Sequence, residues 1–171
     1  MEILSKSTTE TQKLAQTLAQ KLEPGMALAL FGDLGSGKTT FTAFLVKALG
    51  FDCRVQSPTF VIHRRYLRTT CADQTSRASR LGGTGTCASE MCRSAEPWLD
   101  IQTIHHIDLY RLSSREEVLD IGLPEMLSEP HSLVLIEWPE LAREILTPNV
   151  VKLYFTTIDE TTRRIIVEGL E

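Results

Sequence analysis

The segment GDLGSGKT at residues 32–39 matches the pattern G-x-x-x-x-G-K-[ST] and constrains the fold more than any other feature of the chain. Its glycines allow backbone conformations that bring successive N–H groups close to a polyphosphate. Lys38 can reach the β- and γ-phosphates, and the hydroxyl of Thr39 can bind Mg²⁺. Such a loop works between a buried strand and a helix whose N-terminus faces the phosphates. The pattern therefore predicts a strand–loop–helix unit.

The residues on both sides of the loop have the composition that this unit requires. Residues 26–31 (MALALF) are a short apolar run that follows the turn pair Pro24 and Gly25. Residues 38–49 carry apolar side chains at helical spacing, and Gly50 follows where helices commonly end. We therefore expect a strand at 26–31 and a helix at 38–49, with phosphate binding between them.

Length and charge limit the class of protein. At 171 residues the chain suits one domain, which we expect to span residues 1–171. A formal net charge of −4 argues against a protein that binds nucleic acid by charge alone. No run of residues resembles a signal peptide or is long enough to span a bilayer, so we expect a cytoplasmic protein without membrane contacts.

Residues 68–98 differ in kind from the rest of the chain. They are rich in Thr, Ser, Ala, Gly, Arg and Cys and show no hydrophobic period, so we expect a flexible surface insertion between two strands. The spacing of Cys71, Cys87 and Cys92 within it matches no zinc-binding pattern. Together with Cys53, these cysteines are expected to stay reduced.

Hydrophobic patterning predicts further elements outside this region. The capping box STTE at 7–10 opens a helix with Leu14, Leu18 and Leu22 on one face. Strands are expected at 60–66, 103–109, 133–136, 150–156 and 163–168, and helices at 113–119 and 141–146. The alternation of strands and helices predicts an α/β fold with a mostly parallel sheet flanked by helices. Together with the loop motif at 32–39, the predicted fold is P-loop NTPase-like. Antiparallel pairing is expected near the insertion and in a C-terminal β-hairpin.

Two carboxylates stand at the ends of predicted strands. Asp108 ends the segment TIHHID and Glu137 ends the segment LVLIE. Ligands bind beyond the carboxyl ends of parallel strands, so both side chains could face the phosphates. Nucleotide hydrolysis needs a carboxylate near Mg²⁺ and a group that orients the attacking water. The structural alternatives are a solvated strand end for Glu137 and a turn cap for Asp108.

Four other residues are weaker candidates. Thr59, in the turn SPTF at 57–60, could reach Mg²⁺ or the γ-phosphate, or it could be an ordinary turn residue. His105 and His106 alternate faces on one strand, so at most one can point to the site, and we favour a hydrogen-bonded structural role for each. We expect Trp138 to fill the core rather than to lie beside the nucleotide.

Four motifs, taken in order, resemble the TsaE family: GDLGSGKTT at 32–40, SPTF at 57–60, HIDLYR at 106–111 and IEWPE at 136–140. These are small bacterial P-loop ATPases needed for threonylcarbamoyladenosine (t6A) modification of tRNA. The resemblance covers nearly the whole chain apart from about 68–98. It implies a cytoplasmic ATPase that uses ATP and Mg²⁺, acts with TsaB- and TsaD-type proteins and contacts tRNA mainly through their complex.

The resemblance also implies roles for individual residues. Lys38, Glu137, Asp108 and Thr59 would be catalytic, and Thr39, Glu137 and Asp108 would hold the metal ion. The residues expected to bind the nucleotide are Asp33, Leu34, Gly35, Ser36, Gly37, Lys38, Thr39, Thr40 and Arg163. Trp138 would flank the site, and residues 7–10 would approach the adenine together with Arg163. Ser36 departs from the family, where alanine is usual.

Two other functions stay open on the sequence. The arginines of the insertion (Arg68, Arg77, Arg80 and Arg93) could form the lid of a P-loop small-molecule kinase, although the segment lacks the apolar anchors that a closing lid needs. The chain could also be a non-hydrolysing scaffold in which nucleotide binding alone changes partner affinity. A GTPase is disfavoured because the chain contains no N-K-x-D motif.

Overall fold

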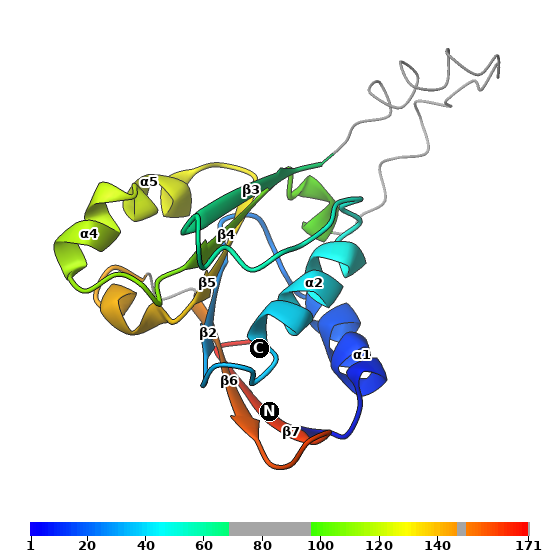
Figure 1. Cartoon of the computed structure of the whole chain (residues 1–171). Helices are drawn as coiled ribbons and strands as arrows, with labels where there is room; N and C mark the ends of the chain where they lie inside the picture. The colour runs from blue at the N-terminus through cyan, green and yellow to red at the C-terminus, as the bar shows by residue number, and fades with distance from the viewer. Residues whose placement is uncertain (69–96, 147–149, 171) are drawn as a thin grey trace, which may run out of the picture.

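The computed structural model describes residues 1–68, 97–146 and 150–170, and within them a seven-stranded sheet has the order β1-β7-β6-β2-β5-β4-β3 (Figure 1). The strands are β1 (Glu2–Ser5), β2 (Ala27–Phe31), β3 (His63–Leu67), β4 (Thr103–Asp108), β5 (Ser132–Glu137), β6 (Val150–Thr157) and β7 (Arg163–Glu168). The helices are α1 (Thr8–Ala19), α2 (Lys38–Ala48), α4 (Arg115–Asp120) and α5 (Leu123–Ser128), with the 3₁₀ helices η1 (Pro97–Asp100) and η2 (Pro139–Ala142).

The sheet is parallel at its centre and antiparallel at its flanks. β6, β2, β5 and β4 pair in parallel. β7 and β1 continue the sheet antiparallel beyond β6, and β3 pairs antiparallel with β4. The sheet is therefore mixed, and the expectation of a mostly parallel sheet holds only for its centre. The predicted C-terminal hairpin is confirmed, since the turn between β6 and β7 is too short for a parallel crossover.

Helices cover the sheet on both faces. Figure 1 shows α1 and α2 together on one side and α4 and α5 on the other. On the first face Leu18, Phe41 and Leu45 belong to a core cluster with side chains of β2, β5 and β6. On the second face Val118 and Leu123 belong to another cluster, which includes apolar residues of β2, β4 and β5. The central parallel strands are thus buried on both faces, as their continuous apolar sequences require.

α1 begins at the predicted capping box. The Ser7 hydroxyl accepts a hydrogen bond from the N–H of Glu10 at 3.3 Å, and the Glu10 carboxylate accepts one from the N–H of Lys6 at 2.6 Å. Leu22 is buried as expected, although α1 ends before it. The box therefore defines the start of the helix but not its end.

Several boundaries differ from the prediction. The cap of α4 is Ser114, one residue later than expected, and its hydroxyl accepts from the N–H of Glu117 at 3.3 Å. The prediction of a helix at 141–146 is wrong, because η2 ends at Ala142 and turns follow it. Leucine and isoleucine side chains of this segment pack on the second core cluster, and this tertiary contact overrides the local helix preference. β1 and α5 were not predicted.

The strand expected at 60–66 begins only at His63. The N–H groups of Val61 and Ile62 both donate to the carbonyl of Pro58, at 2.8 and 2.6 Å, and Ile62 has a φ of 65°. These bonds make residues 58–62 a compact turn. The turn carries Thr59 to the carboxyl end of β4, where the N–H of Asp108 donates to the carbonyl of Ile62 at 2.9 Å.

Most of the predicted insertion lies outside the described residues, and so do Arg77, Arg80, Arg93, Cys71, Cys87 and Cys92. Arg68 at its start is described: Nε donates to the carbonyl of Ile101 at 2.8 Å and Nη2 to that of Trp98 at 3.3 Å. Its guanidinium also lies over the Phe51 ring, 4.7 Å from the centroid. In the parts of the chain that the structure covers, no helix is long and apolar enough to cross a bilayer.

Candidate active site

The loop between β2 and α2 has a backbone conformation that glycine adopts more readily than other residues. Gly32, Gly35 and Gly37 have φ values of 134°, 75° and 102°. A Cβ on Gly32 would lie 2.4 Å from the carbonyl oxygen of Phe155, whereas nothing lies within 4 Å of a Cβ placed on Gly35 or Gly37. Gly32 is therefore required by packing, while the other two leave space beside the loop. That space, at the N-terminus of α2, suits an anion.

Lys38 lies beneath the loop. Its Nζ donates to the carbonyls of Gly32 at 2.6 Å and Asp33 at 2.9 Å, and it lies 4.4 Å from the centroid of the Trp138 ring. Burial lowers the pKa of Lys38, and the nearby carboxylates, Glu137 first, oppose that shift. Within the described residues the ammonium donates to backbone carbonyls, which are neutral acceptors that phosphate oxygens can replace.

Glu137 is the centre of a buried hydrogen-bond network. The Thr39 hydroxyl donates to its carboxylate, at 2.9 Å from Oε1 and 3.1 Å from Oε2. On the other side, Nε2 of His106 lies 2.9 Å from Oε1. Only 3% of Glu137 and none of His106 is exposed. The predicted alternative of a solvated strand end is therefore wrong for Glu137.

Asp108 lies beside Glu137, at the paired position on the neighbouring parallel strand. The Thr59 hydroxyl donates to its Oδ2, and the N–H of Tyr110 donates to its Oδ1 at 2.9 Å. The predicted turn-capping role of Asp108 is thus present, and it leaves one oxygen directed at Thr59. Ser57 and Thr59 share a further hydrogen bond of 2.6 Å between their hydroxyls.

These side chains line a pocket of about 170 Å³ together with loop residues. Its lining includes Leu34, Gly35, Gly37, Lys38, Thr39, Thr40, Thr59, Asp108, Tyr110, Glu137 and Trp138. The side-chain ligands on offer are oxygens, which suit Mg²⁺. Among the described residues, no group of three or more His, Cys, Asp or Glu side chains could hold a metal ion by itself. The donor set fits an ion that keeps several waters and shares its coordination with phosphate.

A second pocket, of about 430 Å³, lies on the other side of the loop. It is lined by loop residues, by Ser7 and Thr8 at the start of α1, and by Arg163 of β7. Nη1 of Arg163 donates to the carbonyl of Asp159 at 2.9 Å, which holds the side chain at the pocket wall. Gly35, Gly37 and Thr40 line both pockets. The loop therefore separates a small polar pocket from a wider one that can accept a base.

The structure brings most predicted site residues together. Ser36 and Arg163 line the wider pocket, and Asp33 lines neither, although its carbonyl accepts from Lys38. Trp138 does not lie only in the core: it packs on the second cluster and also lines the smaller pocket, beside the Tyr110 ring at 4.9 Å.

Two contacts were not predicted from the sequence: His106 beside Glu137, and Tyr110 in the smaller pocket. The strict alternation of side chains along β4 was the available signal, since it turns His106 and Asp108 to the same face. His105 points the other way and forms hydrogen bonds with His63 and Glu129.

Comparison with known proteins places this site in context. The family model described as "Threonylcarbamoyl adenosine biosynthesis protein TsaE" matches residues 5–75 and 86–165. Relatives named "tRNA threonylcarbamoyladenosine biosynthesis protein TsaE" include one from Rickettsia felis, 35% identical over 155 residues, which are 90% of this chain and 71% of the relative. The relative from Streptomyces coelicolor is 33% identical over 165 residues, which are 93% of this chain and 90% of the relative. The one from Bacillus subtilis is 29% identical, with 91% and 77% covered.

Among solved structures, the crystal structure of Bacillus subtilis YdiB is similar, with a TM-score of 0.63. It is 24% identical, and the match covers 96% of this chain and 82% of that one. This likeness shows the mixed α/β fold: a seven-stranded sheet flanked by helices, within the residues that the structure describes.

Proposed function

The chain belongs to the TsaE family of tRNA threonylcarbamoyladenosine biosynthesis proteins, and on that basis we propose that it binds and hydrolyses ATP with Mg²⁺. The observation that carries the proposal is the contact between the Thr39 hydroxyl and both oxygens of the buried Glu137 carboxylate. A carboxylate is costly to bury without a cation, and Lys38 lies close enough that the charge of Glu137 opposes part of the lowering of the Lys38 pKa by burial. A divalent cation bound beside Glu137 would offset the remaining cost of burying its negative charge.

The loop and Lys38 would bind the phosphates. The N–H groups at the N-terminus of α2 provide hydrogen bonds and a favourable dipole, and the Lys38 ammonium provides charge. Thr39 and Glu137 would hold Mg²⁺, and the ion would neutralise charge that develops on the phosphate oxygens. We assign the metal to Glu137 before Asp108 because only Glu137 contacts the loop threonine.

Asp108 and Thr59 would orient the attacking water. Their side chains are hydrogen-bonded to each other and line the smaller pocket together with Lys38. Thr59 lies on a turn rather than on a strand, so it can move when the γ-phosphate binds or leaves. The wider pocket, with Arg163 and residues 7–8, would accept the adenosine.

We place this activity in a cytoplasmic complex with TsaB- and TsaD-type proteins, which would contact the tRNA. Family membership supports a role in the t6A pathway, and the ATPase would act as a helper step for partners that carry the transfer chemistry. One of the four arginines predicted to form the lid of a kinase is bound elsewhere in the structure. Arg68 is held by the carbonyls of Trp98 and Ile101 and by the Phe51 ring.

The test is ATP turnover by the full chain in a reconstituted t6A system. Lys38→Ala and Glu137→Gln should each lower turnover at least a hundredfold, as expected for lost charge stabilisation. Lys47→Ala, at an exposed position of α2, and Glu23→Gln, at an exposed position after α1, are matched controls and should keep it. Wild-type turnover in Lys38→Ala or Glu137→Gln would contradict the proposal.

The same system separates the alternatives. Radiolabelled γ-phosphate should appear as free phosphate, and its appearance on a small molecule would favour a kinase. A non-hydrolysable ATP analogue should not support repeated rounds of tRNA modification, and repeated rounds with it would favour the scaffold.

A further inference from the structure

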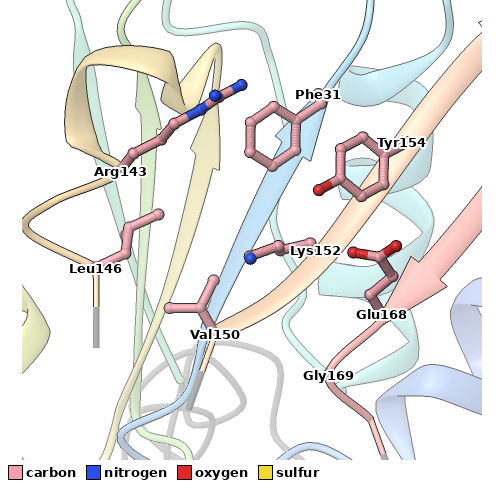
Figure 2. Close-up of a pocket in the computed structure, with 8 residues that line it drawn as sticks. All are labelled: Phe31, Arg143, Leu146, Val150, Lys152, Tyr154, Glu168 and Gly169. Atoms are coloured by element: carbon pink, nitrogen blue, oxygen red, sulfur yellow. The ribbon is translucent and has the colours of Figure 1, made fainter. Parts of the chain in front are cut away.

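A third pocket lies away from the loop, between the turn after η2 and strands β6 and β7 (Figure 2). Its volume of about 550 Å³ exceeds that of either pocket beside the loop. Phe31, Arg143, Lys152, Tyr154 and Glu168 line it with three other residues. None of the proposed catalytic or metal-binding residues lines this pocket.

The pocket has an aromatic wall. The Phe31 and Tyr154 rings are stacked, with centroids 4.8 Å apart and planes 14° from parallel. The Arg143 guanidinium lies over Phe31, 5.6 Å from its centroid. Phe31 is only 7% exposed, whereas Tyr154 is half-buried. Tyr154 therefore offers the ring surface that a ligand could reach.

Two cations border the same space. Figure 2 shows Arg143 entering from the η2 side and Lys152 extending from β6. Both side chains are exposed, and within the described residues neither has a carboxylate within ion-pair distance. Glu168 stands opposite Lys152 in the β6–β7 register and supplies an acceptor at the pocket edge. With Glu168, these two cations leave the pocket lining with one more positive than negative side chain, in a chain of net charge −4.

We propose that this pocket binds a single nucleotide, with its base against Tyr154 and its phosphate between Arg143 and Lys152. An aromatic side chain beside basic groups is the combination that binds single-stranded nucleotides. Glu168 would accept a hydrogen bond from a ribose hydroxyl or a base amino group. A nucleotide carries the planar ring, the anion and the donors together, whereas an acidic peptide carries mainly the anion.

The nucleotide could be free or could be an unpaired residue of an RNA, since both present the same chemistry. The proposal does not depend on ATP hydrolysis at the loop. The binding test uses the uniformly ¹⁵N-labelled full chain titrated with AMP and, separately, with a hexa-adenylate RNA. We expect amide shifts at Lys152, Tyr154 and Gly169.

The two titrations separate the sources. If only the RNA saturates the pocket, the ligand is an unpaired residue of an RNA. If AMP and the RNA both saturate the pocket at equal concentration, the ligand is a free nucleotide. Shifts confined to residues 32–40 with both probes would overturn the proposal, because they would place the ligand only at the loop.

Variants test the contacts by fluorescence anisotropy with labelled hexa-adenylate. Tyr154→Leu should weaken binding roughly fivefold to a hundredfold, the range for loss of one base stack, while Tyr154→Phe should retain it. Arg143→Gln and Lys152→Gln should weaken binding and also reduce its salt dependence.

Lys13→Gln, at an exposed position of α1, is the matched control and should bind as the wild type does. Unchanged affinity in both charge variants would contradict the proposal. Displacement of the RNA by hexaglutamate, with no effect of Tyr154→Leu, would assign the pocket to acidic peptides instead and overturn the nucleotide assignment.

Discussion

At the scale of single residues, Thr39 and His106 hold the Glu137 carboxylate from two sides. Both contacts are hydrogen bonds near 2.9 Å, and His106 is fully buried with no partner for its Nδ1 among the described residues. Within the described residues, Nε2 is therefore the one ring nitrogen of His106 that forms a hydrogen bond. Partners of this kind orient ligating carboxylates and are commonly worth 10- to 100-fold in activity.

His106→Ala should therefore lower kcat for ATP roughly 10- to 100-fold, with little change in KM. His106→Gln, which keeps an N–H donor, should recover part of the loss. Steady-state kinetics over a range of Mg²⁺ concentrations measure both effects. Equal losses in His106→Gln and His106→Ala would show that the histidine acts only by filling space.

Gly32 supports a second prediction at this scale. Gly32→Ala places a Cβ 2.4 Å from a backbone oxygen at a φ of 134°. We expect it to lower the free energy of unfolding by roughly 2–4 kcal/mol, through strain and displacement of β6. Gly25→Ala is the matched control, because it has a φ of 84° and no atom within 4 Å, so it should cost only about 1 kcal/mol. Urea unfolding measures both, and equal losses would contradict the argument.

At the scale of elements, the β6–β7 turn depends on one carboxylate. Asp159 Oδ1 accepts from the N–H groups of Thr161 at 2.9 Å and Thr162 at 2.7 Å. These backbone hydrogen bonds lower the pKa of Asp159 from 3.8 to about 2. Because the folded pKa is depressed, the contribution to stability is complete above about pH 4 and is lost as the pH falls through about 2.

Asp159→Ala should therefore speed amide hydrogen exchange in the hairpin at neutral pH, and the wild-type turn should loosen only between pH 4 and pH 2. NMR exchange and a carboxyl titration measure the two effects. Glu160→Ala, in the same turn, serves as the control. An ordinary titration of Asp159 near pH 3.8 would contradict the prediction.

At the scale of the whole molecule, a chain of hydrogen bonds joins three elements. His63 Nε2 of β3 lies 3.0 Å from His105 Nδ1 of β4, and His105 Nε2 lies 2.9 Å from the carboxylate of Glu129 after α5. Burial is the main cause that lowers the pKa of both histidines from 6.5. The folded chain thus favours their neutral forms.

Stability should accordingly be complete above pH 6.5 and fall as the pH drops below it, because the unfolded chain takes up protons first. Urea midpoints at pH 7.5 and 5.5 should differ less in His105→Gln than in the wild type. His131→Asn, at an exposed position, should keep the wild-type difference. An equal difference in His105→Gln would exclude this group as the cause.

Much of the site could be predicted from the sequence because its parts are local. The loop, its glycines and the strand and helix around it depend on neighbouring residues, and α1 starts at its capping box for the same reason. The prediction assigned residues 60–62 to a strand, but they belong to the turn at 58–62, because hydrogen bonds to Pro58 compete there with strand pairing. β1 exists only because β7 pairs with it.

By itself, the sequence determined that a glycine-rich loop lies between a buried strand and a helix, since sterics and hydrogen bonds within a few residues decide that. Only the tertiary structure decided that Glu137 lies against Thr39 and that Asp108 lies against Thr59. Parallel pairing of β4 with β5 sets those positions, and pairing joins residues distant in the chain. The pocket lined by Arg143 and Tyr154 also depends on the tertiary structure, because the turn after η2 meets β6 only in the folded chain.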